Sequence, residues 1–383
     1  MGKENLNRVY LPGLNAMRFM AASFVIVAHT EMFKSIYGLP NFVEYSNLLN
    51  FGGLGVYFFF VLSGFLITYL LLEEKERYGK INLKAFYVRR ILRIWPLYYL
   101  MVLLGFFVFP QISFLEVGYL NGQFLLQKWE NFWLFMLMSP NIAFSFMEAV
   151  PHIGQLWSIG VEEQFYLLWP VFFRKLKSKL SLFIFLFILI ISIKVMFISL
   201  IKLNILPESE FVLGLKRLIA MSKFESMMIG AIGANIVRGG SERLKKVMLN
   251  DWVFFSSLLF FPFVKILLPS SLDDVYHVIG SLCFIVIIVN VSIGGRFSKL
   301  LEMRLFSFLG NISYGLYMYH MVISFFFVKL FSVINADSIV ESLLLYVLIF
   351  GVSILISFLS YRFFEKPFLK MKGKFTLVQS GKE

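Results

Sequence analysis

Long apolar runs constrain this sequence more than any other feature. Three of them fall at about residues 180–201, 275–294 and 340–362, and each is nearly free of charged side chains. A helix needs about 20 apolar residues to cross a bilayer. Charged residues make up 15% of the 383-residue chain, well below the roughly 25% of soluble domains. The sequence therefore predicts an all-α polytopic membrane protein.

The apolar runs divide the chain into about ten transmembrane helices. One further apolar segment, Trp129–Met138, ends at Ser139-Pro140 and is too short to cross. It is expected to be re-entrant or interfacial. The expected spans are residues 14–33, 53–72, 94–110, 154–173, 180–201, 218–237, 252–268, 275–294, 306–331 and 340–362.

The distribution of basic residues predicts the orientation of these spans. Most lysines and arginines between spans fall in alternate connections, and cytoplasmic connections carry such an excess. Both termini are therefore expected to be cytoplasmic. The connections on the opposite side carry only Lys34, Lys128, Lys202, Lys216 and Arg217. We expect residues 1–383 to be a single membrane domain with its core at 10–370, and no appended soluble domain.

The first span contains two ionisable residues, Arg18 and His29. Their spacing of three helical turns places both on one face, roughly 16 Å apart along the axis. One interpretation is structural: Arg18 extends to the headgroups, and His29 is a satisfied polar residue near the outer interface. The other interpretation makes His29 a general base, because imidazole accepts a proton near neutral pH.

The stretch QLWSIGVEEQFYLLWP, residues 155–170, carries two adjacent carboxylates, Glu162 and Glu163, inside an apolar run. Ionisable groups at membrane depth cost several kcal/mol and often mark functional sites. Glu162 is expected roughly 12 Å from the outer end of its helix, at a depth comparable to that of His29. Adjacent helical residues point about 100° apart, so only one carboxylate is expected to orient His29, and Glu162 is favoured. The alternative is a buried structural ion pair.

Three arginines, Arg89, Arg90 and Arg93, crowd against Trp95-Pro96 at the edge of the third span. Arg90 and Arg93 share a helix face. Cytoplasmic charge bias explains their presence, whereas an anion clamp for a phosphate-rich ligand also explains their crowding. The small residues of the run 52–65 are expected to serve close helix packing.

Two motifs near the carboxyl end are weaker signals. In SYGLYMYH, residues 313–320, the tyrosines and His320 either line a polar cavity or form hydrogen bonds between helices, and the second interpretation is favoured. Arg362 and Glu365 are expected to pair at the cytoplasmic interface. His152 and His277 receive no role. The histidines and the single cysteine are too scattered for a metal site, so no metal is expected.

Six motifs in order resemble the membrane acyltransferase-3 family of bacterial integral-membrane O-acyltransferases. They are Arg18-x10-His29, the small-residue run at 52–65, the arginine cluster before Pro96, WSIGVEEQFY, SYGLYMYH and Glu365-x-Pro367. The resemblance covers about residues 10–370. It implies transfer of an acyl group, usually acetyl, from cytosolic acyl-CoA to a hydroxyl of a cell-surface carbohydrate such as a polysaccharide or O-antigen. It implies that His29 is catalytic and that Arg18, Arg90 and Arg93 handle the acyl-CoA, while Glu162 and Glu163 match the family's carboxylate motif.

The residues and the resemblance predict one reaction scheme. The arginines hold the phosphates of acetyl-CoA, and His29, oriented by Glu162 or Glu163, deprotonates the acceptor hydroxyl. Direct transfer and a transient acyl-histidine are both open. The expected acceptor is a carbohydrate, free or lipid-linked, the expected location is the bacterial plasma membrane, and nucleic acid is not an expected partner. The alternative is a transporter or flippase of lipid-linked glycans or anions, although the inverted repeats typical of transporters are not visible.

Overall fold

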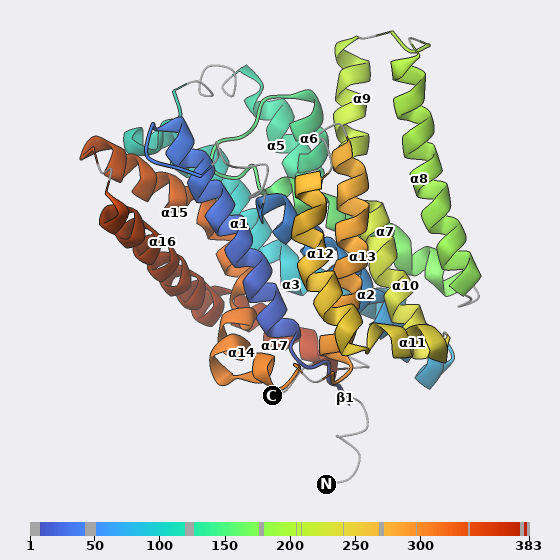
Figure 1. Ribbon diagram of the computed structural model, residues 1–383. Helices are drawn as coiled ribbons and strands as arrows, with labels where there is room; N and C mark the ends of the chain where they lie inside the picture. Colours follow the sequence, from blue (N-terminus) through green and yellow to red (C-terminus); the bar gives the residue numbers. More distant parts are fainter. Residues whose placement is uncertain are drawn as a thin grey trace.

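Helices form nearly all of the described chain in the computed structural model (Figure 1). The structure describes residues 8–42, 51–118, 126–175, 180–203, 205–207, 209–239, 241–267, 272–295, 297–335, 338–375 and 379–380. The longer helices are α1 (Leu14–Ile36), α2 (Phe51–Tyr78), α3 (Leu83–Leu103), α7 (Leu156–Lys175), α8 (Leu180–Lys202), α9 (Glu210–Met221), α10 (Phe224–Gly239), α12 (Asp251–Leu267), α13 (Asp273–Ser292), α15 (Ser313–Val333) and α16 (Ile339–Ser360).

Shorter elements complete the bundle. They are the α-helices α5 (Lys128–Met136), α6 (Pro140–Phe146), α11 (Glu242–Met248), α14 (Arg304–Asn311) and α17 (Lys366–Lys372), the π-helical turns η2 (Leu104–Val108) and η7 (Tyr361–Glu365), the 3-10 turns η3 (Phe109–Gln111), η4 (Ser113–Leu115), η6 (Leu300–Glu302) and η8 (Gly373–Phe375), and the strands β1 (Arg8–Val9) and β2 (Gln379–Ser380).

Each of the ten expected spans has a helix in the structure, and seven helices within the described residues are long and apolar enough to cross a membrane. Helices α7, α10 and α12 do not reach that combined length and hydropathy. The expected span at 306–331 is divided into α14 and α15 at Ile312. The polytopic helical class is therefore confirmed, while the count of ten crossings stays a prediction.

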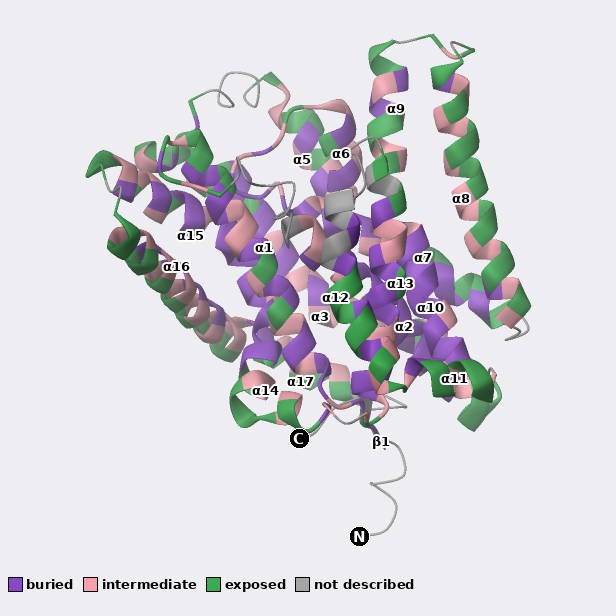
Figure 2. Cartoon of the chain, in the orientation of Figure 1, coloured by how far each residue is buried: buried purple, intermediate pink, exposed green. Residues whose placement is uncertain are grey.

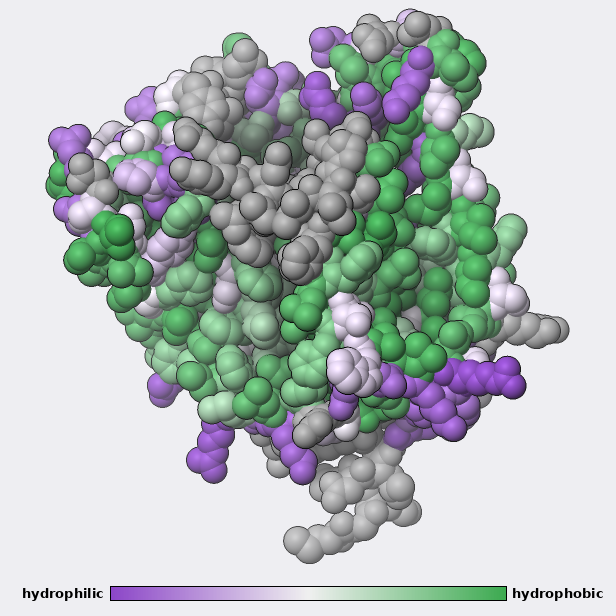
Figure 3. All heavy atoms as spheres, in the orientation of Figure 1, coloured by the Kyte–Doolittle hydropathy of each residue, from purple (hydrophilic) through white to green (hydrophobic). Residues whose placement is uncertain are grey.

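Burial separates central from peripheral helices (Figure 2). Within its most apolar window α2 is 72% buried, whereas α16 is 22% and α8 only 6% buried. In Figure 1, α8 and α9 stand at one side of the bundle as a tall hairpin. Figure 3 shows apolar side chains across the middle of the visible face, with hydrophilic ones above and below. Such an exposed apolar belt is expected to contact lipid, because its side chains are about as apolar as the lipid tails.

Glycines let the central helices approach closely. A Cβ placed on Gly55 of α2 would lie 2.4 Å from the carbonyl oxygen of Ala21 on α1, and one on Gly64 would lie 1.9 Å from the carbonyl oxygen of Met227 on α10. No side chain fits at either distance, so α2 is pressed against backbone on two sides. The packing role expected for residues 52–65 agrees with these contacts.

The segment expected to be re-entrant or interfacial, Trp129–Met138, forms the short helix α5, and the short helix α6 follows it after Ser139. Neither approaches the roughly 20 residues of a span. Asn141 of α6 and Gln164 of α7 exchange two amide hydrogen bonds of 3.1 and 2.9 Å, which holds α6 against the helix that carries Glu162 and Glu163.

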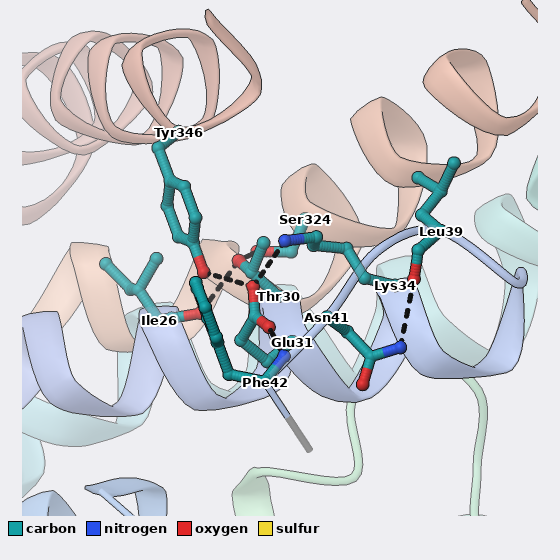
Figure 4. Close-up of polar contacts among 9 residues, drawn as sticks. All are labelled: Ile26, Thr30, Glu31, Lys34, Leu39, Asn41, Phe42, Ser324 and Tyr346. Carbon is teal, nitrogen blue, oxygen red and sulfur yellow. Dashed lines mark hydrogen bonds and ion pairs between the residues drawn. The ribbon is translucent and has the colours of Figure 1, made fainter. Parts of the chain in front are cut away.

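A buried polar cluster joins the carboxyl-terminal end of α1 to α16 (Figure 4). Lys34, 2% exposed, pairs with Glu31 at 2.7 Å, and Tyr346 of α16 donates to the same carboxylate at 2.6 Å. The backbone N–H of Phe42 donates to its other oxygen at 2.5 Å. The neighbouring residue Thr30 forms a hydrogen bond of 3.1 Å with Ser324 of α15. The carboxylate therefore has three partners, which offset the cost of burying it.

The two described ends of the chain meet at one end of the bundle. Strands β1 and β2 pair in parallel, with Arg8 opposite Gln379 and Val9 opposite Ser380. Both ends therefore lie on the same side, as an even number of crossings requires. Their assignment to the cytoplasm stays a prediction.

Candidate active site

A cavity opens between α1, α2, α3, α7 and α15, and its empty volume, including its mouth, is about 820 Å³. Apolar side chains of α2, among them Phe59, Phe60 and Leu66, form much of its wall. The remaining lining includes charged and hydroxyl-bearing residues from all five helices. These polar lining residues are Arg18, Ser63, Arg90, Arg93, Ser158, Glu162, Tyr166, Ser313, Tyr314 and Tyr317.

The three predicted donor-binding arginines converge in this cavity. Arg18 comes from α1, while Arg90 and Arg93 come from one face of α3, and the three guanidinium groups lie close enough to repel one another. Arg90 stacks over the ring of Tyr166 at 5.4 Å, and its buried Nε has no hydrogen-bond partner among the residues that the structure describes. Concentrated positive charge with an unused donor is what an anion site requires.

Arg89, the third arginine of the cluster, points elsewhere. It pairs with Glu74 at 3.3 Å and donates to the carbonyl oxygen of Phe375 at 2.9 Å. It does not line the cavity. The helical spacing that places Arg90 and Arg93 on one face therefore turns Arg89 towards the end of the bundle.

Glu162 is the carboxylate that lines the cavity. Its Oε1 accepts a hydrogen bond of 2.8 Å from Ser63, and its Oε2 accepts one of 3.0 Å from Tyr166. Tyr166 lies one helical turn after Glu162 and also carries Arg90 above its ring. Glu162 is thus held beside the arginines by two hydroxyl groups.

Glu163 has a different environment, as the 100° between neighbouring helical positions predicts. It does not line the cavity. Its Oε2 accepts a hydrogen bond of 3.1 Å from the indole nitrogen of Trp95, while its buried Oε1 has no hydrogen-bond partner in the described part of the chain.

The partner of His29 is a second histidine. Nδ1 of His29 lies 3.0 Å from Nε2 of His320 on α15 and 3.1 Å from the carbonyl oxygen of Val25. Nδ1 of His320 in turn lies 2.7 Å from the carbonyl oxygen of Tyr317. The tyrosine ring lines the cavity, and its hydroxyl meets Ser158 at 2.6 Å. His29 is therefore one residue removed from the cavity wall.

This arrangement corrects one expectation about geometry. Glu162 or Glu163 was expected to orient His29, with Glu162 favoured, but among the described residues no hydrogen bond joins His29 to either carboxylate. The rise along a helix gives an expected depth, whereas the direction of each side chain depends on how α1 and α7 are rotated. The catalytic role of each residue stays a prediction.

Comparison with known proteins decides the family. A model described as an acyltransferase domain, Acyl_transf_3, matches residues 11–362. The chain belongs to this family. The match covers the spans, the cavity and five of the six motifs that suggested the resemblance, while Glu365-x-Pro367 lies just beyond it. The resemblance is thereby confirmed.

Curated acyltransferase relatives align with nearly the whole chain. O-acetyltransferase OatA of Staphylococcus aureus strain NCTC 8325 / PS 47 is 27% identical over 383 aligned residues, covering 95% of this chain and 58% of that protein. Putative O-acetyltransferase SACOL0978 of strain COL is 27% identical over 378 residues, covering 94% and 58%. The chain thus spans 58% of the length of these relatives. No solved structure matches it.

Several residues around the cavity were not singled out from the sequence. Ser63 and Tyr166 hold Glu162, and Lys372 of α17 lies within electrostatic reach of the three arginines. Tyr166 could have been found, because residues four apart on a helix face each other. Ser63 and Lys372 could not, since their positions depend on which helices meet.

The carboxyl-terminal motifs divide between cavity and helix contacts. Tyr314 lines the cavity and donates to the carbonyl oxygen of Ile94 on α3 at 2.8 Å, while Tyr319 bonds Ser360 at 3.0 Å. The expected pair of Arg362 and Glu365 is wrong. The side chain of Glu365 accepts from Ser360 at 3.2 Å, and Arg362 lies over the ring of Phe363. A π-helical turn spans both positions and changes the usual side-chain spacing.

The histidines without an assigned role lie apart from the cavity. His277 stacks on Tyr57 with ring centres 3.9 Å apart. Nε2 of His152 lies 2.7 Å from the carbonyl oxygen of Leu115 in the connection before α7. Within the described residues no group of three or more His, Cys, Asp or Glu could hold a metal ion.

Proposed function

We propose that this chain is an integral-membrane O-acyltransferase of the bacterial plasma membrane. It moves an acetyl group from cytosolic acetyl-CoA to a hydroxyl of a cell-surface carbohydrate, with both termini in the cytoplasm. The observation that carries the proposal is the meeting of Arg18, Arg90 and Arg93 in one cavity of a chain that belongs to an acyltransferase family. The printed names of the relatives, O-acetyltransferases, support the acetyl group.

The cavity lining suits both the phosphate end and the acyl end of an acyl-CoA. Phosphates attract forked guanidinium groups, and three of these converge here. The apolar wall of Phe59, Phe60 and Leu66 suits the less polar part of the donor that carries the acyl group. Among the described lining residues Glu162 is the only carboxylate, so three arginines leave the cavity with net positive charge. Glu162 accepts hydrogen bonds from Ser63 and Tyr166.

His29 acts as the general base in this proposal. It removes the proton from the acceptor hydroxyl, the oxygen forms a bond to the thioester carbonyl carbon, and the carbon–sulfur bond breaks. The departing thiolate then takes the proton from His29, so that free CoA and an acetyl ester result. The arginines hold the donor and orient it. Direct transfer needs no covalent enzyme intermediate, and trapping an acetylated His29 would replace this scheme by a two-step one.

Purified protein in proteoliposomes tests the activity. We expect radiolabelled acetyl-CoA to release CoA and to label an added glycan acceptor, free or lipid-linked, and His29→Ala to remove both signals while the thermal unfolding temperature is kept. Movement of intact glycan or anion across the membrane without CoA release would support the transporter alternative and overturn the proposal. Full activity of His29→Ala would reject His29 as the base.

A pair of arginine substitutions tests the donor site. Arg93→Lys keeps the charge but loses the fork, so KM for acetyl-CoA should rise about 10-fold, equivalent to about 1.4 kcal/mol. Arg89→Lys is the matched control, since Arg89 belongs to the same cluster but points away from the cavity. Equal KM values for the two variants would remove the phosphate clamp from the proposal.

The acceptor is best identified in cells. Surface polysaccharide from a deletion strain should lack acetyl groups that reappear on complementation with the wild-type chain and not with His29→Ala. Mass spectrometry of the released glycan measures this difference, and identical spectra would exclude a surface-glycan acceptor.

A further inference from the structure

We infer that His320 is a positioning residue that fixes the tautomer of His29, with the proton on Nδ1 and the basic lone pair on Nε2. The inference rests on the proposed role of His29 as the general base. It assigns a task to a residue of α15 that lies 291 positions away in the sequence.

The chain begins at the main-chain carbonyl of Tyr317, which can only accept a hydrogen bond. Nδ1 of His320 lies 2.7 Å from this oxygen, so Nδ1 of His320 carries a proton. His320 is 0% exposed, and among the described residues no carboxylate contacts its ring. A buried charge without a partner would be costly, so the ring is neutral and its Nε2 is a bare acceptor.

That bare nitrogen faces His29. Nε2 of His320 lies 3.0 Å from Nδ1 of His29, and with no proton of its own it requires that Nδ1 of His29 be the donor. The two rings are tilted by 42° with centres 5.0 Å apart, an edge-to-edge approach and not a stack. The proton of neutral His29 is therefore on Nδ1.

A second acceptor gives the same assignment independently. The carbonyl oxygen of Val25 lies 3.1 Å from the same Nδ1, and a carbonyl can only accept. Val25 belongs to the same helix as His29, whereas His320 comes from another helix. Together the two contacts set both the tautomer and the rotation of the ring.

The remaining nitrogen of His29, Nε2, is therefore the one that accepts the proton of the acceptor hydroxyl. When it does, the positive charge of the imidazolium strengthens the Nδ1–H bond to neutral His320. A histidine partner stabilises this cation less than a carboxylate would, but it adds no buried negative charge at membrane depth. Glu162 thus stays available beside the arginines.

Tyr317 connects this device to the cavity. Its carbonyl anchors His320, and its ring lines the cavity with the hydroxyl held by Ser158 and by the carbonyl oxygen of Gln155 at 3.1 Å. One turn of α15, from Tyr317 to His320, therefore both positions His29 and forms part of the cavity wall.

Nitrogen NMR tests the tautomer without reference to activity. The chain has 4 histidines, so protein labelled with ¹⁵N-histidine in nanodiscs gives few signals, and His29→Gln and His320→Gln assign them. We expect His29 to show a protonated Nδ1 and an unprotonated Nε2, with coupling between Nδ1 of His29 and Nε2 of His320. A protonated Nε2 in neutral His29 would overturn the inference, and the measurement decides it even if the proposed activity fails.

Kinetics test the positioning role. His320→Leu removes the acceptor, and we expect kcat to fall by about 10- to 100-fold, as for other groups that orient a catalytic ligand, with KM for acetyl-CoA unchanged. His320→Gln offers an amide oxygen to His29 and should recover most of that loss. Tyr319→Phe is the control, because Tyr319 lies on the same helix as His320 and loses only a hydrogen bond to Ser360 of α16. It should keep kcat. Equal losses in His320→Leu and His320→Gln, or a rise in KM alone, would contradict a positioning role.

Discussion

Ser63 on α2 donates a hydrogen bond of 2.8 Å to Glu162 on α7 and fixes one oxygen of this carboxylate inside the cavity. The bond joins two helices and holds the negative charge of Glu162 beside the cavity arginines. It thereby separates the tasks of the two adjacent carboxylates, since Glu163 is bound to Trp95 outside the cavity.

Glu162→Gln and Glu163→Gln should therefore differ in their kinetics. Glu162→Gln removes the negative charge from the cavity and should lower kcat about 10-fold or more if Glu162 shapes the reacting site. KM for acetyl-CoA should stay equal or fall in this variant, because the cavity becomes more positive. Glu163→Gln keeps an acceptor for Trp95 and should change either constant little. Steady-state assays in proteoliposomes decide, and a larger kcat loss in Glu163→Gln would reverse the assignment.

A methyl group at Gly64 should separate α2 from α10. Gly64→Ala places Cβ 1.9 Å from the carbonyl oxygen of Met227, so the helices must move apart. We expect overpacking to destabilise the fold by about 1 to 3 kcal/mol, measured as a lower thermal unfolding temperature. Gly351→Ala on α16 has no atom within 4 Å of the new Cβ and is the control. Equal unfolding temperatures would show that the α2–α10 contact relaxes without cost.

The buried pair of Glu31 and Lys34 should show strong coupling. Glu31→Gln leaves the ammonium of Lys34 buried without its carboxylate and should cost about 3 to 5 kcal/mol. Adding Lys34→Met to Glu31→Gln removes the uncompensated charge and should recover much of that loss. Chemical unfolding of the two single variants and the double variant measures the coupling, and additive losses would contradict it.

His152 should make stability depend on pH. Burial is the main cause that lowers the pKa of His152 from its ordinary value of 6.5; Lys329 lowers the pKa further, and the hydrogen bond to Leu115 opposes this shift. The unfolded chain therefore binds the proton more readily, and the folded state loses stability as the pH falls through about 6.5.

The variant His152→Asn tests this sign. Asn removes the titratable ring and tolerates the positive φ of 62° at this position. The free energy of unfolding of the wild type should fall relative to that of the variant between pH 7.5 and 5. Parallel pH profiles would show that His152 does not titrate on unfolding.

The sequence predicted what depends on composition along the chain. Apolar length located a helix for every expected span, and three-residue spacing placed Arg90 and Arg93 on one face, because helical geometry is local. It did not predict that His29 meets His320, since that contact depends on the rotation of α1 against α15. The division at Ile312 and the π-helical turn at Glu365 were missed for a related reason, because tertiary packing and not hydropathy decides where a helix is interrupted.

The convergence of Arg18, Arg90 and Arg93 also affects the protein before any donor arrives. Three like charges held in one cavity repel one another, so the folded state stores an unfavourable energy that a bound polyanion relieves. A ligand that binds only the folded state raises its stability with concentration. If the proposed donor binds here, the resistance of the protein to unfolding should rise with the supply of acetyl-CoA.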